Sequence, residues 1–150
     1  MNVVALDTNV VLRLVHSAAP EHTACQSAVR ALATQGCRLV VPAQVVVEFW
    51  VVATRPTNVN GLGWSPSAAR EKVDQLLTLV QVLPEPTDVF RTWLDIVTSP
   101  GTSGKRAHDA RIAATLRAHG VRHILTLNDA DFSSFPDLTT INPTAPTPVE

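Results

Sequence analysis

The sequence has few cysteines, and this shortage excludes the protein classes that are built on them. Cys25 and Cys37 are the only two in 150 residues, and they do not form a Cys-x-x-Cys pair. A small domain held together by disulfides would carry several pairs. The cysteine usage therefore predicts a reduced, cytoplasmic protein.

Long apolar runs are also missing. Runs such as those at 45–47 and 49–53 are far shorter than the roughly 20 residues that a helix needs to cross a bilayer. The N-terminus lacks a basic segment followed by an apolar stretch and a cleavage site, so no signal peptide is expected. We therefore expect no membrane partner.

Charge of either sign is scarce. Charged residues make up 17% of the chain, and the net charge is -1. This balance argues against a strongly basic nucleic-acid-binding module, although bound metal ions can bring an acidic site to a phosphate. The 45% of hydrophobic residues predicts a chain that folds around one core. We expect one domain over residues 1–143, followed by a disordered, proline-bearing tail over 144–150.

Short apolar runs alternate with stretches of helical periodicity along this domain. Strands are predicted at 3–6, 38–41 (ended by Pro42), 80–83, 123–127 and 139–141. Helices are predicted at 9–17, 21–35, 67–79, 87–97 and 105–119. The segment 43–54 is ambiguous, because its valines favour a strand and its length favours a helix. The alternation predicts an α/β fold with three layers, α/β/α, and a central, mostly parallel sheet of four to five strands.

Acidic and amide residues follow the predicted strands. Asp7 ends the first strand, Asp109 lies in the first turn of the helix before the fourth strand, and Asn128 and Asp129 follow that strand. Parallel strands bring their carboxyl ends to one edge, where open α/β sheets bind ligands. Helix capping explains Asp7, Asn128 or Asp129 singly, and the helix dipole explains Asp109. Their convergence on one edge favours a site.

Glu48 is a carboxylate surrounded by apolar residues, in Val45-Val46-Val47-Glu48-Phe49-Trp50-Val51-Val52. Burying an unpaired carboxylate costs several kcal/mol. Glu48 could lie on an exposed helical stripe with Gln44, but the apolar residues around it leave little room for such a stripe. We therefore favour a functional or ion-paired role for Glu48.

These segments together resemble the PIN domain family of ribonucleases, and in particular the VapC toxins of bacterial toxin–antitoxin pairs. The matching segments are Leu-Asp-Thr-Asn at 6–9, the apolar helix that carries Glu48, His-Asp-Ala at 108–110 and Thr-Leu-Asn-Asp-Ala-Asp-Phe at 126–132. Their order and spacing agree from residue 3 to about residue 143. The resemblance implies a metal-dependent endoribonuclease that is the toxin of a type II toxin–antitoxin system.

The resemblance places Asp7, Glu48 and Asp109 at the acidic positions that hold a divalent metal. The fourth acidic position of the family falls on Asn128 here, which is a departure, although an amide oxygen also suits a hard cation. Asp129 or Asp131 could supply the missing charge, and we prefer Asp131 as the fourth catalytic acid.

Two neighbours of these acids receive supporting roles. Thr8 and Asn9 would orient Asp7 or bind a phosphate at the helix start. His108 is interpreted as a helix-surface residue rather than a general acid.

The resemblance further implies a cofactor and partners. An all-oxygen ligand set selects Mg²⁺, with Mn²⁺ as a substitute, and such an ion would activate water for attack on an RNA phosphodiester. A cognate antitoxin and an RNA substrate are the expected partners, and the toxin is expected to be a homodimer. Trp64 and Phe132 are expected to be exposed in a sticky patch that a partner covers.

Two other interpretations remain. A catalytically weak PIN-like scaffold that binds RNA or protein is the alternative, because Asn128 replaces an acid. A doubly wound phosphate receiver is disfavoured, because its acids would cluster early in the chain. The basic residues of the C-terminal half could follow an RNA backbone or only solvate a helix face; these are Lys105, Arg106, Arg111, Arg117 and Arg122.

Overall fold

A five-stranded, entirely parallel sheet forms the centre of the molecule, in a computed structural model that describes residues 2–99 and 102–145. The strand order is β3-β2-β1-β4-β5. The strands are β1 (Val3–Leu6), β2 (Arg38–Pro42), β3 (Gln81–Leu83), β4 (His123–Leu125) and β5 (Thr139–Ile141). This sheet confirms the predicted α/β fold class.

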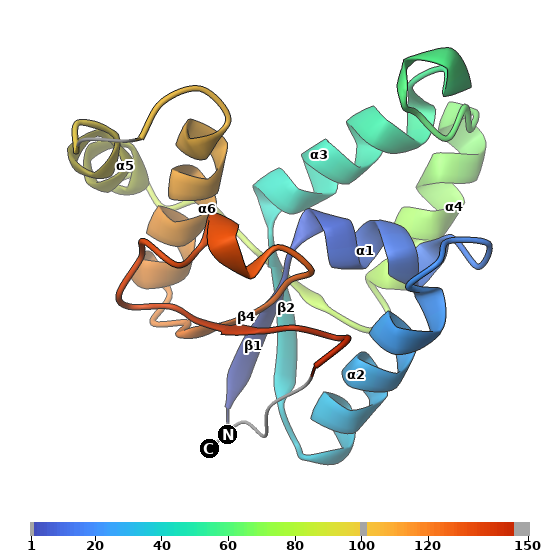
Figure 1. Ribbon diagram of the computed structural model, residues 1–150, viewed down its shortest axis with the longest axis horizontal. Coiled ribbons are helices and arrows are strands. Elements are labelled where there is room, and N and C mark those ends of the chain that lie inside the picture. Colours follow the sequence, from blue (N-terminus) through green and yellow to red (C-terminus); the bar gives the residue numbers. More distant parts are fainter. Residues whose placement is uncertain (1, 100–101, 146–150) are drawn as a thin grey trace.

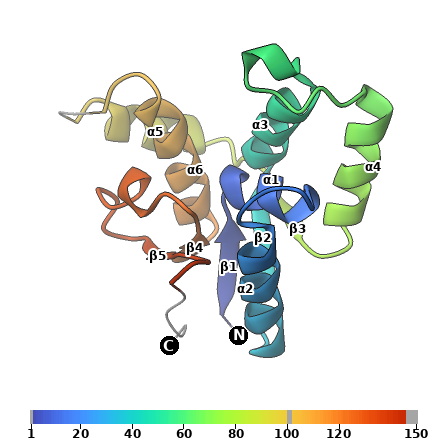
Figure 2. The ribbon, with the colours of Figure 1, turned by 45° about the vertical axis from the view of Figure 1, so that its right-hand side comes forward.

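Helices pack on both faces of the sheet (Figures 1 and 2). They are α1 (Thr8–Val15), α2 (His22–Thr34), α3 (Ala43–Thr54), α4 (Pro66–Leu76), α5 (Val89–Val97) and α6 (Arg106–Ala118). The chain passes from β1 to β2 and β3 through α1 to α4, then returns to the other side of β1 through α5 and α6. Because parallel crossovers are right-handed, the reversal places these two groups of helices on opposite faces.

The strand order reverses between β1 and β4. β1 pairs with β2 on one side and with β4 on the other, with Leu6 opposite Leu125 at the carboxyl end. In open α/β sheets, such a reversal leaves a crevice outside the carboxyl ends of the two strands. The residues that follow Leu6 and Leu125 therefore enter this crevice.

The ambiguous segment 43–54 is the helix α3. Val45, Phe49 and Ala53 recur at intervals of four residues, and all three are fully buried. This helical spacing buries one stripe of α3, which overrides the β propensity of its valines. The other side is exposed at Val47 and Val51, contrary to the expectation that α3 has little room for an exposed stripe.

Three strand boundaries differ from the prediction, and the smallest difference is that β3 begins at Gln81 instead of residue 80. Pro42 is the last residue of β2 rather than its terminator, because its φ of −59° suits both a strand end and the entry to α3. β4 ends at Leu125 instead of residue 127. The backbone N–H of Leu127 donates to the Asn9 side chain at 3.2 Å instead of extending the sheet.

The prediction that Trp64 and Phe132 are exposed in a sticky patch is wrong. Phe132 is fully buried in the core, and it packs beside Phe135 with ring centroids 6.1 Å apart. Trp64 is half-buried, with its ring against Phe49. The exposed large hydrophobic side chains lie elsewhere, at Val47, Val51, Val59, Leu77, Leu79, Phe90 and Leu94.

Two expectations concern the ends and the environment of the chain. Of the predicted tail, residues 146–150 lie outside the described residues. Within residues 2–99 and 102–145, no helix has the length and apolar character needed to span a bilayer.

Two phenylalanines offer a matched test of this core. Phe49 in α3 is 0% exposed, whereas Phe90 in α5 is 67% exposed. We expect Phe49→Ala to lower the free energy of unfolding by about 3–5 kcal/mol, because it removes a buried ring and leaves a cavity. Phe90→Ala should change it by less than about 0.5 kcal/mol. Urea denaturation of both variants measures the difference, and equal losses would contradict the assignment of α3 to the core.

Candidate functional site

A pocket of about 660 Å³ opens where β1 and β4 end, and we call it the acidic pocket. Its walls come from the start of α1, one side of α3, the first turns of α6 and the segment after β4. Its polar lining comprises Asp7, Thr8, Asn9, Gln44, Glu48, Arg55, Lys105, His108, Asp109, Arg111, Asn128 and Asp131. The structure thus brings every sequence-predicted site residue to one place, except Asp129.

Asp7 is fixed at the floor of this pocket. It caps α1, and its Oδ1 accepts a hydrogen bond from the backbone N–H of Thr8 at 2.8 Å. Its Oδ2 accepts from the Thr126 hydroxyl at 2.7 Å. Burial raises the pKa of Asp7 above its usual value, and the charges of Glu48 and Asp131 raise it further, while the two hydrogen bonds oppose this rise. Asp7 therefore both caps α1 and lines the acidic pocket.

Glu48 is held by hydrogen bonds from two elements. Its Oε2 accepts from the Thr8 hydroxyl at 2.6 Å, and its Oε1 accepts from the Gln44 amide at 2.7 Å. The same amide nitrogen donates to the backbone oxygen of His108 at 3.0 Å. Gln44 therefore links Glu48, on α3, to the first turn of α6.

Asp109 lies in the first turn of α6, and it is 9% exposed. Burial raises its pKa to about 6, and the neighbouring charges of Asp131, Asp7 and Glu48 add to the rise, while Lys105 opposes it. The packing that holds it there comes from the buried alanines of α6, Ala110, Ala113 and Ala114. Small side chains let α6 approach the sheet, as the sequence predicted.

The segment after β4 carries two acids, Asp129 and Asp131, and only Asp131 lines the acidic pocket. Lys105 approaches the carboxylate of Asp131 at 3.8 Å. Asp129 is exposed and instead accepts a hydrogen bond from the Asn142 side chain at 3.2 Å. Asn128 also lines the pocket. The geometry therefore favours Asp131 over Asp129 for the fourth acidic position.

Thr126 is a site residue that the sequence did not identify. Besides donating to Asp7, its hydroxyl oxygen accepts from the Asn128 backbone N–H at 3.0 Å and from the Asn9 side chain at 3.4 Å. It joins the end of β1 to the segment after β4. A buried threonine directly after a strand was the available signal, but nothing in the sequence shows which side chain it meets.

Gln44 and Lys105 were also not predicted as site residues, because their roles arise from contacts between separate elements. His108 is exposed on α6, as expected. Arg111 and Arg117 form ion pairs with Glu85 and Asp137. Together with Lys105, which pairs with Asp131, three of the five residues of the basic group make ion pairs.

The donor atoms of the acidic pocket fit a hard divalent cation. Within residues 2–99 and 102–145, no three His, Cys, Asp or Glu side chains form a group that could hold a metal by themselves. Mg²⁺ needs no such cage, because it keeps several waters and takes one or two carboxylates. The charge of Asp7 adds to the rise in the pKa of Asp109, and a bound cation would relieve that repulsion. The Gln44 amide oxygen, buried and without a hydrogen-bond partner in the described chain, is a further oxygen donor.

Curated relatives cover nearly the whole chain. Ribonuclease VapC24 of Mycobacterium tuberculosis, from strains CDC 1551 / Oshkosh and H37Rv, is 28% identical over 135 residues. The match covers 87% of this chain and 90% of that protein.

Solved structures share the fold. One is VapBC2 from Rickettsia felis, bound to a DNA fragment from its promoter, with a TM-score of 0.71 and 15% identity over 93% of this chain and 98% of that chain. Another is FitAcB from Neisseria gonorrhoeae, with a TM-score of 0.68 and 23% identity over 94% and 98%. VapC20 of Mycobacterium tuberculosis, described as a toxin that cleaves the sarcin–ricin loop, has a TM-score of 0.62 and 18% identity over 81% and 86%.

The PIN domain family model matches residues 4–138. That span includes the two strands that meet at the reversal of the sheet and all four carboxylates around the acidic pocket. The chain therefore belongs to the PIN domain family.

Proposed function

We propose that this chain is a divalent-metal-dependent endoribonuclease and the toxin of a type II toxin–antitoxin pair. The observation that carries the proposal is the gathering of Asp7, Glu48, Asp109 and Asp131 around one pocket at the reversal of the sheet. A relative that is named a ribonuclease over nearly the whole chain supports the reaction class. Hydrolysis of an RNA phosphodiester needs no protein nucleophile if a metal site is present.

Asp7, Glu48 and Asp109 would hold the cation, with Asp131 as the fourth acid. Mg²⁺ is the proposed ion, with Mn²⁺ as a substitute, since the donors are oxygens. When bound, the ion would supply the Lewis acidity that activates water and stabilises the charge on the phosphate. Each Asp7 oxygen accepts one hydrogen bond from the protein, which leaves each a second lone pair for a ligand.

Other side chains keep these acids in place. Thr8 and Gln44 fix both oxygens of Glu48, so that its carboxylate faces the pocket in one orientation. Asn9 and Thr126 hold the segment after β4 against α1. Such support lowers the cost of ordering the acids around a cation and a phosphate.

The proposed protein partner is an antitoxin segment that covers the acidic pocket. Val47, Val51 and Leu12 give the pocket an apolar wall, and two of these, Val47 and Val51, are exposed. A segment that sets apolar side chains on this wall and an arginine among the acids would match both features. Solved structures with this fold include a toxin–antitoxin complex from Klebsiella pneumoniae and VapBC-5 from Mycobacterium tuberculosis, which supports this partner. A homodimer of the toxin remains part of the proposal.

Growth arrest and RNA cleavage test the proposed function. Expression of the chain in a bacterial host should arrest growth, and the purified protein with Mg²⁺ should cleave single-stranded RNA. Glu48→Gln should abolish arrest and lower cleavage by roughly a hundredfold or more. The amide can still accept from Gln44 and donate to Thr8, so circular dichroism and the melting temperature should stay near those of the wild type.

The matched control is Asp129→Asn, which removes a carboxylate from outside the pocket and should keep arrest and cleavage. Co-expression of the open reading frame next to this gene should restore growth. Undiminished cleavage by Glu48→Gln would contradict the site, and absence of cleavage by the wild type would contradict the function.

Metal binding is tested by thermal shift. A ligand that binds only the folded state stabilises it, by about 2.7 kcal/mol when its free concentration is about 100 times the Kd. Mn²⁺ should therefore raise the melting temperature of the wild type and of Asp129→Asn. Asp7→Asn should lose most of this rise, and Asp131→Asn should lose part of it. The same rise in all four proteins would place the ion elsewhere.

The raised pKa of Asp109 predicts a pH dependence of the metal-free protein. Its proton leaves at about 6 in the folded chain, against an ordinary value of 3.8. Because the folded state binds this proton more tightly, Asp109 favours folding most below pH 3.8, and this contribution is lost as the pH rises through about 6. The difference in free energy of unfolding between the wild type and Asp109→Asn should decrease as the pH rises from 3.8 to about 6. It should stay constant above that pH. Urea unfolding in EDTA measures it, and parallel curves would refute the shift.

A further inference from the structure

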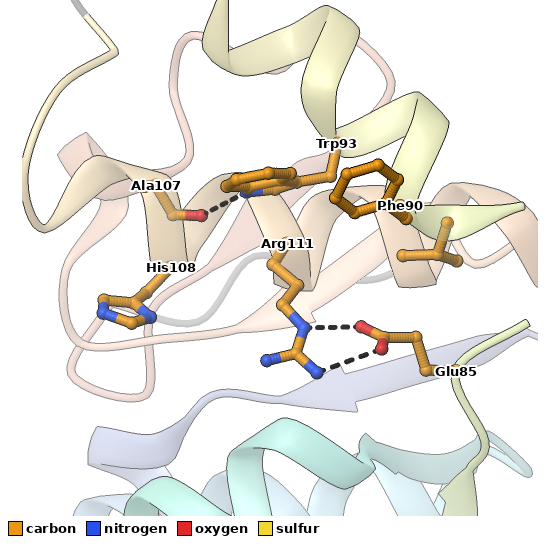
Figure 3. A pocket seen from close by; sticks show the side chains of 7 residues that line it. Glu85, Phe90, Trp93, Ala107, His108 and Arg111 are labelled. Atoms are coloured by element: carbon orange, nitrogen blue, oxygen red, sulfur yellow. Dashed lines mark hydrogen bonds and ion pairs between the residues drawn. The ribbon is translucent and has the colours of Figure 1, made fainter. Parts of the chain in front are cut away.

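A second pocket, of about 330 Å³, lies beside the acidic pocket, and we call it the aromatic pocket (Figure 3). Its lining comprises Glu85, Val89, Phe90, Trp93, Ala107, His108 and Arg111. His108 and Arg111 line both pockets. A ligand that enters the acidic pocket can therefore extend over these two residues into the aromatic pocket.

Two aromatic rings from α5 form one wall of the aromatic pocket (Figure 3). The indole N–H of Trp93 donates to the backbone oxygen of Ala107 at 2.8 Å, which fixes the ring against α6. Phe90 lies next to it, with ring centroids 5.9 Å apart and planes tilted by 36°. Phe90 remains largely exposed, so this wall presents an uncovered aromatic surface.

A charged pair closes the opposite side. Arg111 reaches across from α6 to the Glu85 carboxylate, with Nε to Oε1 at 2.6 Å and a terminal guanidinium nitrogen to Oε2 at 3.0 Å (Figure 3). This two-point contact holds the guanidinium plane in one orientation. Both side chains stay partly open to solvent. A planar ligand would thus meet aromatic rings on one side and a fixed guanidinium and carboxylate on the other.

We infer that the aromatic pocket binds one unstacked nucleobase of a single-stranded RNA whose backbone lies in the acidic pocket. This inference rests on the proposed ribonuclease function and assigns it a base subsite. Proteins read single-stranded RNA by stacking its bases on aromatic rings and guanidinium planes and by hydrogen bonds to the base edges. Phe90 and Trp93 supply the rings, and Arg111 and Glu85 supply a donor and an acceptor.

The polar side of the pocket favours a base over an apolar protein side chain. A leucine or phenylalanine from a protein would cover the half-exposed Arg111–Glu85 pair without satisfying its free donors and acceptors, which costs free energy. A base edge carries both kinds of group and can satisfy them. The shared wall with the phosphate-facing acidic pocket gives a base the connection to its own backbone.

Leu94 supplies a matched control for this test. It is an exposed apolar residue one helical turn after Phe90 on α5, and it does not line the aromatic pocket. Phe90→Ala and Leu94→Ala therefore each remove an exposed apolar side chain from the same helix. Only the first removes a wall of the pocket.

The experiment measures RNA binding by fluorescence anisotropy with Mg²⁺, in a Glu48→Gln background that stops cleavage. The probes are a single-stranded RNA pentanucleotide of mixed sequence and the same chain built with abasic riboses. Phe90→Ala should weaken binding of the intact RNA about fivefold to a hundredfold, the range expected for one stacked base. It should leave binding of the abasic chain unchanged. Leu94→Ala should leave both unchanged.

Four results would overturn the inference. If Phe90→Ala leaves RNA binding unchanged, or weakens binding of both probes equally, the aromatic pocket does not bind a base. Equal losses with Leu94→Ala, or a change of oligomeric state with RNA binding intact, would make this face of α5 a protein interface. In each case wild-type cleavage of RNA would leave the proposed function standing. A wild type that neither binds nor cleaves RNA would contradict the function and the inference together.

Discussion

Repulsion among like charges in a desolvated pocket is the constraint on which this structure depends. Asp7 and Asp109 are both buried; burial raises the pKa of each, and the charges of neighbouring carboxylates add to the rise. Carboxylates in such surroundings separate or take up protons unless the surrounding structure holds them. Here hydrogen bonds and packing hold them. Thr8 and Thr126 fix Asp7, Gln44 fixes Glu48, and close alanine packing holds the first turn of α6 against the sheet.

The supporting hydrogen bonds connect the two halves of the fold at their junction. Thr126 joins β1 to the segment after β4, and Gln44 joins α3 on one face to α6 on the other. The acids are therefore contributed by four separate segments, yet they are coupled through two polar side chains. Because the fold holds these carboxylates close together, binding of a cation among them would stabilise the folded state. Stability and ligand binding are thus linked in one set of contacts.

Sequence reasoning succeeded where a local pattern determined the structure. The strand–helix alternation determined the parallel sheet, and Asp7 and Asp109 followed from their places at strand and helix ends. It failed where partners are distant in sequence. The contact of Thr126 with Asp7 and that of Gln44 with His108 have no local signature. Phe132 was expected at the surface, but it follows the short turn at Asp129–Asp131 and is fully buried in the core.

The Thr126–Asp7 hydrogen bond spans 119 residues, and this length has a consequence for synthesis. Domains fold from the N-terminus as the ribosome extends the chain, and contacts between distant residues form last. β1 lies in the middle of the sheet, but the ribosome makes its partner β4 only after α1 to α6, β2 and β3. Until then one edge of β1 is unpaired and two of the four acids, Asp109 and Asp131, are absent or unplaced. The order of elements along the chain therefore delays assembly of the acidic pocket until the segment after β4 has been made.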